Sequence, residues 1–176
     1  MADLPDLKQE NDFVKNTLLD WIRDLVKKYE IDGLRIDTIP EVPKWFWKLF
    51  SEAAGVYQVG EVFDGRVNYV SDYQNYLDAL LNYPVFFAMK NAFQYNGSMK
   101  QFESTLADVG RNFKDSSVLG VFVNNHDNAR FLNNNGNIGK FKNSIAFSLM
   151  TSKVYYFIIL LYCFIVCFIV YFNLLL

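Results

Sequence analysis

Cysteine is nearly absent from this chain of 176 residues, which contains only two. Both of them, Cys163 and Cys167, lie in an apolar run near the C-terminal end, so residues 1–152 carry no thiol. A disulfide framework is therefore excluded for that part of the chain, and cysteine usage does not indicate a redox compartment.

Positive charge is also sparse. Lysine and arginine number 17 against 19 acidic residues, the formal net charge is -2, and no cluster of basic residues occurs. Proteins that bind nucleic acid need a concentrated basic surface, so nucleic acid is excluded as a partner. Residues 1–4 lack the charged start and apolar run of a secretory signal, so no signal peptide is expected in this chain.

The chain does contain carboxylates that follow short apolar segments. Residues 33–36 are predicted to form a short buried strand that ends at Asp37, and the two-residue period of a strand puts Arg35 and Asp37 on one side. A cation beside Asp37 should keep its carboxylate ionised, which is the state that a nucleophile needs. An ordinary ion pair at a strand end explains the same pattern.

Two further segments end in the same way. Residues 57–61 end at Glu61, and residues 121–127 end at Asp127. Three acidic strand ends in one chain favour a single shared site over three unrelated ion pairs.

Helical patterns separate the strands. Residues 11–29 place apolar side chains at intervals of three and four behind a capping asparagine, and residues 43–54 form a second helical pattern that ends before a glycine. The second helix lies between the strand at 33–36 and one expected at 56–60. This order predicts a βαβ unit with the first two acidic residues at equivalent ends of adjacent parallel strands.

The later part of the chain is predicted to repeat this pattern. Strands are expected at 77–81 and 118–124, helices at 85–93, 98–110 and 140–150, and a loop at 133–139. The run at 118–124 is almost continuously apolar, as expected for a parallel strand covered on both faces. The chain is therefore predicted to be an α/β protein.

Several of these stretches carry a resemblance to a known family. Residues 32–38, 60–65 and 122–131 resemble three signatures of the alpha-amylase family of glycoside hydrolases, and residues 4–7 and 81–84 resemble its fungal branch. They occur in the order of the family and at nearly its spacings. An ordered set of motifs is far more specific than one short motif alone.

The family fold is a (β/α)8, or TIM, barrel, which takes about 250 residues. The resemblance therefore implies a partial barrel in which residues 1–152 supply about four βα units of the second half. Residues 153–176 would follow as a C-terminal apolar helix. Because about 20 apolar residues span a bilayer, residues 154–172 are expected either to associate with a membrane or to be a gene-model extension, such as an unspliced A/T-rich intron.

The resemblance also implies the chemistry. Asp37 would be the nucleophile, Glu61 the acid and base, and Asp127 the third carboxylate, which holds the distorted sugar and helps to keep Glu61 protonated. No basic residue stands beside Glu61 in sequence, so like charges are expected to raise its pKa. The residues expected to contact or shape the substrate site are Arg35, Phe63, Asp64, Gly65 and His126. For Phe63, stacking on a sugar and packing under its loop are equally favoured, and the two residues after it are expected to shape that loop.

Calcium is the cofactor that the resemblance implies. Asp6 matches the position of a carboxylate ligand in the family, and oxygen ligands suit this ion. The Lys-His pair that follows the nucleophile in the family is replaced by Pro40 and Glu41, so only the backbone carbonyl of Glu41 is left as a second ligand. The other ligands would come from sequence before Met1, and the site is expected to be incomplete in this chain.

The implied function is that of a retaining alpha-1,4-glucan endohydrolase that acts on starch or glycogen, present as a fragment that is inactive alone. Two alternatives stay open. One is a membrane-held amylase-like domain without catalysis, and the other is a sister alpha-glucosidase or transglycosylase, which uses the same three carboxylates. The intact family acts outside the cell or in the secretory pathway, and that is the location expected for an intact protein.

Overall fold

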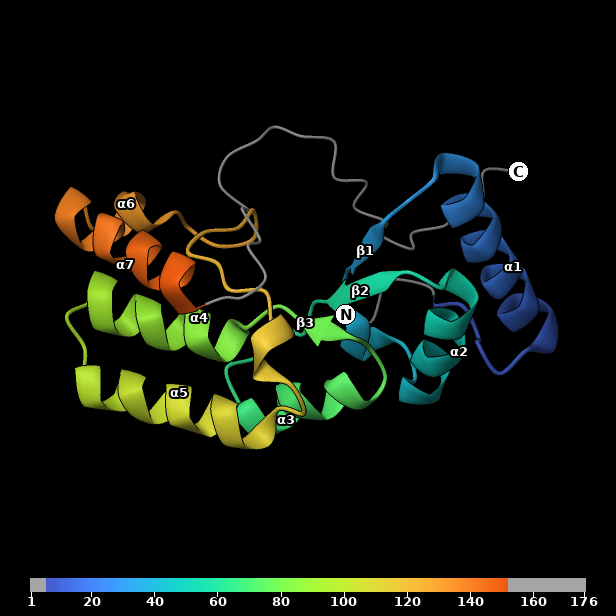
Figure 1. Ribbon diagram of the computed structural model, residues 1–176, viewed down its shortest axis with the longest axis horizontal. Coiled ribbons are helices and arrows are strands. Elements are labelled where there is room, and N and C mark those ends of the chain that lie inside the picture. The colour runs from blue at the N-terminus through green and yellow to red at the C-terminus, as the bar shows by residue number, and fades with distance from the viewer. Residues whose placement is uncertain (1–5, 152–176) are drawn as a thin grey trace.

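The structure, a computed structural model, describes residues 6–151. Figure 1 shows an α/β fold in which a small parallel sheet lies between two groups of helices. The strands are β1 (Gly33–Ile36), β2 (Tyr57–Gly60) and β3 (Ala79–Leu80). The α-helices are α1 (Asp12–Tyr29), α2 (Lys44–Ala54), α3 (Val67–Asp72), α4 (Tyr83–Met89), α5 (Met99–Asn112), α6 (Phe131–Asn134) and α7 (Ile138–Thr151). Short 3-10 turns lie at Ile39–Glu41 (η1), Tyr73–Asn75 (η2) and Ser116–Val118 (η4), and a π-helical turn lies at Lys90–Gln94 (η3).

Helix α1 forms where the apolar spacing predicted it. The side chain of Asn11 accepts hydrogen bonds from the backbone N–H groups of Phe13 and Val14, at 2.9 and 3.3 Å, and so caps the helix. Its apolar face buries Leu18 and Ile22, and α1 packs against α2. The prediction of a helix at 11–29 is confirmed.

The sheet is parallel, in the order β1-β2-β3. The pairing continues just beyond the strands, since Glu61 N–H donates to the carbonyl of Ile36 at 2.8 Å and Leu81 N–H donates to the carbonyl of Gly60 at 2.9 Å. The predicted βαβ unit is therefore confirmed. Its register brings the residues that follow β1 and β2 to the same edge of the sheet.

The strand expected at 118–124 is not formed. This segment makes one parallel bridge, between Leu81 and Gly120. Gly120 N–H donates to the carbonyl of Leu80 at 3.0 Å, and the carbonyl of Gly120 accepts from Asn82 N–H at 2.9 Å. Within residues 6–151 the sheet has three strands, and nothing described there pairs with the far side of this segment. Leu119 and Phe122 of this segment are buried and its three valines are half-buried, which is why the pattern indicated a strand.

Other differences are in length and in short elements. The strand expected at 77–81 is reduced to β3, and the helix expected at 85–93 begins earlier and continues into the η3 turn. Helix α6 falls partly in the expected loop at 133–139, whereas α3 and η2 were not predicted. Helices of one or two turns are too short for an amphipathic repeat, so periodicity cannot reveal them.

Two apolar clusters lie on the two faces of the sheet. On one face, Gln58 accepts a hydrogen bond from Ser51 Oγ of α2 at 3.2 Å, so this face is covered by the helices and holds the larger cluster. Because side chains alternate along a strand, Val59 points to the opposite face. The smaller cluster there consists of Val59, Ala79, Leu81, Tyr83, Phe86 and Phe122.

The close packing at the end of β2 gives a prediction. A Cβ atom on Gly60 would lie 1.9 Å from Ile39 Cδ1 and 2.9 Å from Leu77 Cδ1. We therefore expect Gly60→Ala to lower the free energy of unfolding by about 1–3 kcal/mol, measured by urea titration. The control is Gly110→Ala in α5, where a Cβ would meet nothing within 4 Å and should raise stability by about 0.5–1 kcal/mol. Equal stability of the two variants would contradict this packing.

Among the described residues, no helix has both the length and the apolar character needed to cross a membrane. The apolar run at 154–172, for which a membrane-spanning helix or a gene-model extension was expected, lies outside the described residues, as does the rest of 153–176.

Candidate active site

The sheet brings two of the predicted carboxylates together. Asp37 follows β1 and Glu61 follows β2, and Arg35 lies between them. Arg35 Nη1 is paired with Asp37 Oδ1, and Arg35 Nη2 lies 3.2 Å from Glu61 Oε2. The three side chains are largely buried, with Glu61 only 7% exposed.

The position of Arg35 adds a basic neighbour to Glu61. No basic residue stands beside Glu61 along the sequence, and the structure supplies one from the adjacent strand. The parallel register pairs Arg35 with Val59, two residues before Glu61, and the guanidinium therefore reaches both carboxylates. A contact between strands of this kind is invisible to reasoning that considers only neighbours along the chain.

The pKa of Asp37 is shifted downward. Partial burial raises the pKa of this carboxyl, but hydrogen bonds from Arg35 and Glu61 outweigh burial and hold the pKa below its ordinary value. Asp37 is therefore ionised at neutral pH, as a nucleophile must be.

The pKa of Glu61 is shifted in the opposite direction. Burial is the main cause that raises the pKa of this carboxyl, and the adjacent Asp37 raises it further. The Tyr83 hydroxyl and the charge of Arg35 oppose these effects without cancelling them. Two adjacent carboxyl groups whose pKa values are driven apart can serve as a base or nucleophile and an acid.

Two residues of this site were missed by the sequence reasoning. Tyr83 Oη donates a hydrogen bond of 2.8 Å to Glu61 Oε1, and Asn125 Nδ2 donates one of 2.7 Å to Tyr83 Oη. Both residues lie inside stretches that resemble the family, 81–84 and 122–131, but neither is a carboxylate at a strand end. The signal for Tyr83 was its place three residues after the third strand of the sheet, at the start of α4.

Thr38 also belongs to the site. Its backbone is in the left-handed region, with φ 46° and ψ 48°, which a β-branched residue rarely adopts. In this conformation its N–H donates to Glu61 Oε2 at 3.3 Å, and its hydroxyl donates to Asp37 Oδ2 at 3.1 Å. Such a residue costs of order 1–3 kcal/mol and marks a place where the surrounding structure imposes the geometry.

Asp127 and His126 lie in a more exposed loop. Asp127 Oδ2 is 3.2 Å from His126 Nε2, and the two side chains are 42% and 59% exposed. The negative charge of Asp127 raises the pKa of Tyr83, so it acts on the site from the side of that tyrosine. The third predicted carboxylate therefore influences this site through its charge on Tyr83, and it lacks the burial that Asp37 and Glu61 share.

The segment after Glu61 presents an aromatic surface. Phe63 is 54% exposed, and its ring lies against those of Tyr83 and Phe87, with centroids 4.8 and 5.7 Å apart. Asp64 accepts hydrogen bonds from the backbone and the guanidinium of Arg66, so it shapes the loop. A Cβ on Gly65 would lie 3.3 Å from Phe87, so the loop passes close to α4 at this glycine.

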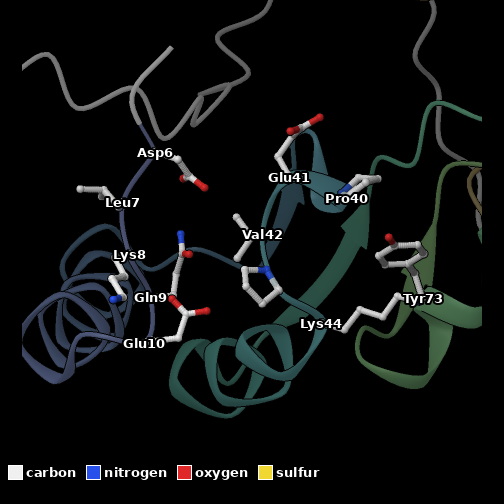
Figure 2. A pocket seen from close by; sticks show the side chains of 11 residues that line it. Asp6, Leu7, Lys8, Gln9, Glu10, Pro40, Glu41, Val42, Lys44 and Tyr73 are labelled. Carbon is white, nitrogen blue, oxygen red and sulfur yellow. The ribbon is translucent and has the colours of Figure 1, made fainter. Parts of the chain in front are cut away.

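Asp6 and Glu41, the two residues expected to bind calcium, line a cavity of about 570 Å³ beside η1. This cavity is separate from the carboxyl pair, because neither Asp37 nor Glu61 lines it. Figure 2 shows the Asp6 carboxylate directed toward the space between the N-terminal segment and η1, whereas the Glu41 carboxylate extends outward. Within the described part of the chain, no three His, Cys, Asp or Glu side chains gather closely enough to hold a metal ion. Asp6 and the carbonyl of Glu41 do not by themselves fit calcium, which takes 6–8 oxygen ligands.

Comparisons of sequence and of structure with known proteins agree on one family. The family described as "Alpha amylase, catalytic domain" matches residues 1–158. Alpha-amylase 1 of Lipomyces kononenkoae is 40% identical over 152 residues, which are 86% of this chain and 24% of that protein. The solved alpha-amylase of Malbranchea cinnamomea is 41% identical with a TM-score of 0.80, over 83% of this chain and 31% of that one.

A second solved structure, the alpha-amylase of Geobacillus thermoleovorans complexed with acarbose, is 31% identical with a TM-score of 0.76. The match covers 84% of this chain and 36% of that chain. In each comparison the chain spans between 24% and 36% of the length of the protein that it matches.

Proposed function

Because the chain belongs to the alpha-amylase family of glycoside hydrolases, we propose that it forms part of the catalytic barrel of a retaining, endo-acting alpha-1,4-glucan hydrolase. The observation that carries this proposal is the buried pair of carboxyl groups, Asp37 and Glu61, joined by Arg35 and shifted in pKa in opposite directions. A retaining glycosidase needs an ionised carboxylate and a protonated one close together.

In the proposed reaction, Asp37 attacks the anomeric carbon while Glu61 gives its proton to the glycosidic oxygen, and the bond between these two sugar atoms breaks. A covalent glycosyl ester of Asp37 remains. Glu61, now ionised, takes a proton from water, and the resulting hydroxyl attacks the same carbon and releases Asp37. Two inversions at one carbon give a product with the original anomeric configuration.

The substrate contacts are proposals of the same kind. The exposed ring of Phe63 offers a stacking surface on the side where the leaving sugar would depart. Asp127 and His126 are exposed enough to reach sugar hydroxyl groups, which suits the roles of third carboxylate and hydrogen-bonding partner. An alpha-glucan substrate is supported by the names of the relatives and by the acarbose complex of the Geobacillus enzyme.

We further propose that the chain works only together with other barrel strands. The described sheet has three strands, against eight in a complete barrel. Asp6 and the carbonyl of Glu41 would then contribute to a calcium site whose other ligands lie in the remainder of the protein. An extracellular or secretory location is proposed for the complete protein, by which we mean this chain with the rest of its barrel.

Product analysis on starch tests the proposal. The complete protein is expected to lower the viscosity of starch before much reducing sugar forms, and NMR of the fresh products should show the alpha anomer first. Activity should fall at low pH as Asp37 gains a proton and at high pH as Glu61 loses one. Because the pKa of Asp37 is lowered and that of Glu61 is raised, the active range should be wider than for two free carboxyl groups.

Other outcomes would assign a different activity. Release of glucose alone from chain ends indicates an alpha-glucosidase, and formation of longer chains indicates a transglycosylase. A product that appears first as the beta anomer would contradict the retaining mechanism.

A further inference from the structure

We propose that Tyr83, held by Asn125, is a positioning residue that fixes the carboxyl group of Glu61 and stabilises it after it has given up its proton. The proposal rests on the proposed function, because it concerns the acid and base of that reaction. It adds a residue from the third strand end to a site that the sequence indicated only through carboxylates.

The geometry of Tyr83 suits this role. Its side chain is completely buried, and its ring is packed against Phe63, Phe86 and Phe122 at centroid distances of 4.8, 5.8 and 5.1 Å. The hydroxyl accepts from Asn125 Nδ2 at 2.7 Å and donates to Glu61 Oε1 at 2.8 Å. With its ring enclosed and its oxygen already accepting from an amide, the hydroxyl can direct its single proton to the carboxyl group.

Asn125 is itself fixed from the other side. Its Oδ1 accepts from the backbone N–H and the side-chain amide of Asn128, at 3.0 and 2.9 Å. Its amide nitrogen must therefore be the group that faces Tyr83, which determines the direction of the whole hydrogen-bond chain. The backbone carbonyl of Asn125 also accepts from Arg130 Nη1 at 2.8 Å.

The two oxygens of Glu61 are held from different elements. Oε1 is held by Tyr83 at the start of α4, and Oε2 is held by the backbone N–H of Thr38 at 3.3 Å and by Arg35 Nη2 at 3.2 Å. Donors on both oxygens fix the plane of the carboxyl group. They also favour its ionised form, which appears once the proton has moved to the leaving sugar.

The charged and titratable groups around Glu61 determine whether loss of the Tyr83 hydroxyl raises or lowers the pKa of Glu61. From the β1 side come Arg35 and Asp37, and from the α4 side comes Tyr83, on which Asp127 also acts. Burial raises the pKa of Tyr83, and Glu61 raises it further, so the phenol keeps its proton as a donor. Since the Tyr83 hydroxyl lowers the pKa of Glu61, removing it should raise that pKa further.

The test is Tyr83→Phe in the complete protein, a change that keeps the packed ring and removes one hydroxyl. We expect the basic limb of the pH profile of kcat/KM on starch to move upward by about one pH unit, the size of a hydrogen bond to a charged group. We also expect kcat to fall about 10-fold with little change in KM, because the lost contact is strongest to the ionised carboxyl.

The matched control is Tyr57→Phe at the start of β2. Its hydroxyl donates to the carbonyl of Val118 at 3.0 Å, so this variant also loses one tyrosine hydrogen bond in the same sheet. The basic limb should not move in Tyr57→Phe. An unmoved limb in Tyr83→Phe, or equal shifts in the two variants, would overturn the proposal.

A second variant tests the part played by Asn125 and covers the case in which Tyr83→Phe does not fold. Asn125→Ser removes the amide donor and should move the basic limb in the same direction by a smaller amount. In the Tyr83→Phe background the same change should add nothing to the shift, because no hydroxyl remains to be held. Full additivity would show that Asn125 does not act through Tyr83.

A direct measurement separates this inference from the proposed function. The pKa of the Glu61 carboxyl can be followed by carbon-13 NMR in the complete protein without any substrate. If starch is not hydrolysed but Tyr83→Phe raises this pKa, the proposed function fails and the positioning role stands. If starch is hydrolysed and the pKa is unchanged, the positioning role fails alone.

Discussion

Replacing Asp37 by asparagine in the complete protein is expected to lower the rate of starch hydrolysis on the order of 10⁶-fold, the scale for removing a covalent nucleophile. The amide keeps the shape of the side chain but cannot attack the anomeric carbon. The substitution also removes the negative charge that pairs with Arg35, a residue of β1. The measurement is the initial rate of reducing-sugar release, with mass spectrometry of the denatured protein to detect a glycosyl ester.

The matched control for this change is Asp108→Asn. Asp108 is also paired with an arginine, Arg111, but on the exposed surface of α5. Exposed pairs of this kind contribute about 0–1 kcal/mol, so the control should keep its activity. A glycosyl ester found on the Asp37→Asn protein would show that another residue is the nucleophile.

Glu61→Gln is expected to lower the rate on starch by about 10²- to 10⁴-fold, the range for a general acid, while the protein still binds maltooligosaccharides. Glutamine can accept the hydrogen bond that Tyr83 donates, but it has no acidic proton to give. Initial rates and binding constants measured on the same preparation separate the two effects. A maltosyl fluoride substrate should still form the glycosyl ester, because fluoride departs without a proton.

Glu103→Gln on α5 is the matched control, since it makes the same change on an exposed residue.

Azide supplies an anion that attacks without a general base, so it should restore turnover of the fluoride substrate in Glu61→Gln and should not restore it in Asp37→Asn. A nearly normal rate of Glu61→Gln on starch would remove Glu61 from the role of acid.

The parts of the fold that could be predicted from sequence are those whose signals are local. The cap at Asn11 and the apolar spacing behind it define α1, and Gly55, with φ 63°, ends α2 where a glycine was expected to end it. A connection between two parallel strands through a helix is right-handed in nearly all proteins, so this order of elements leaves one arrangement of β1 and β2. That arrangement aligns Asp37 with Glu61. That alignment was the main content of the sequence prediction, and it is present in the structure.

The parts that could not be predicted depend on contacts between distant segments. The apolar run at 118–124 indicated a strand, but a strand needs partners for its backbone, and the described chain gives it one bridge. The approach of Arg35 to Glu61 follows from a register that periodicity does not specify. The hydroxyl of Tyr83 reaches Glu61 across 22 positions of sequence, and no local pattern records such a contact.

The left-handed turn at Thr38 has a consequence for how the protein would respond to heat. The turn is held by hydrogen bonds on either side of it, from Glu61 N–H to Ile36 and from Ile39 N–H to the carbonyl of Glu61. When these bonds loosen, the backbone of Thr38 can return to an ordinary conformation, and that relaxation releases free energy that opposes reclosing. That release, on the order of 1–3 kcal/mol, makes opening at this turn easier than opening around an unstrained residue would be. Heating is therefore expected to disturb the end of β1 and, with it, the alignment of the two carboxyl groups.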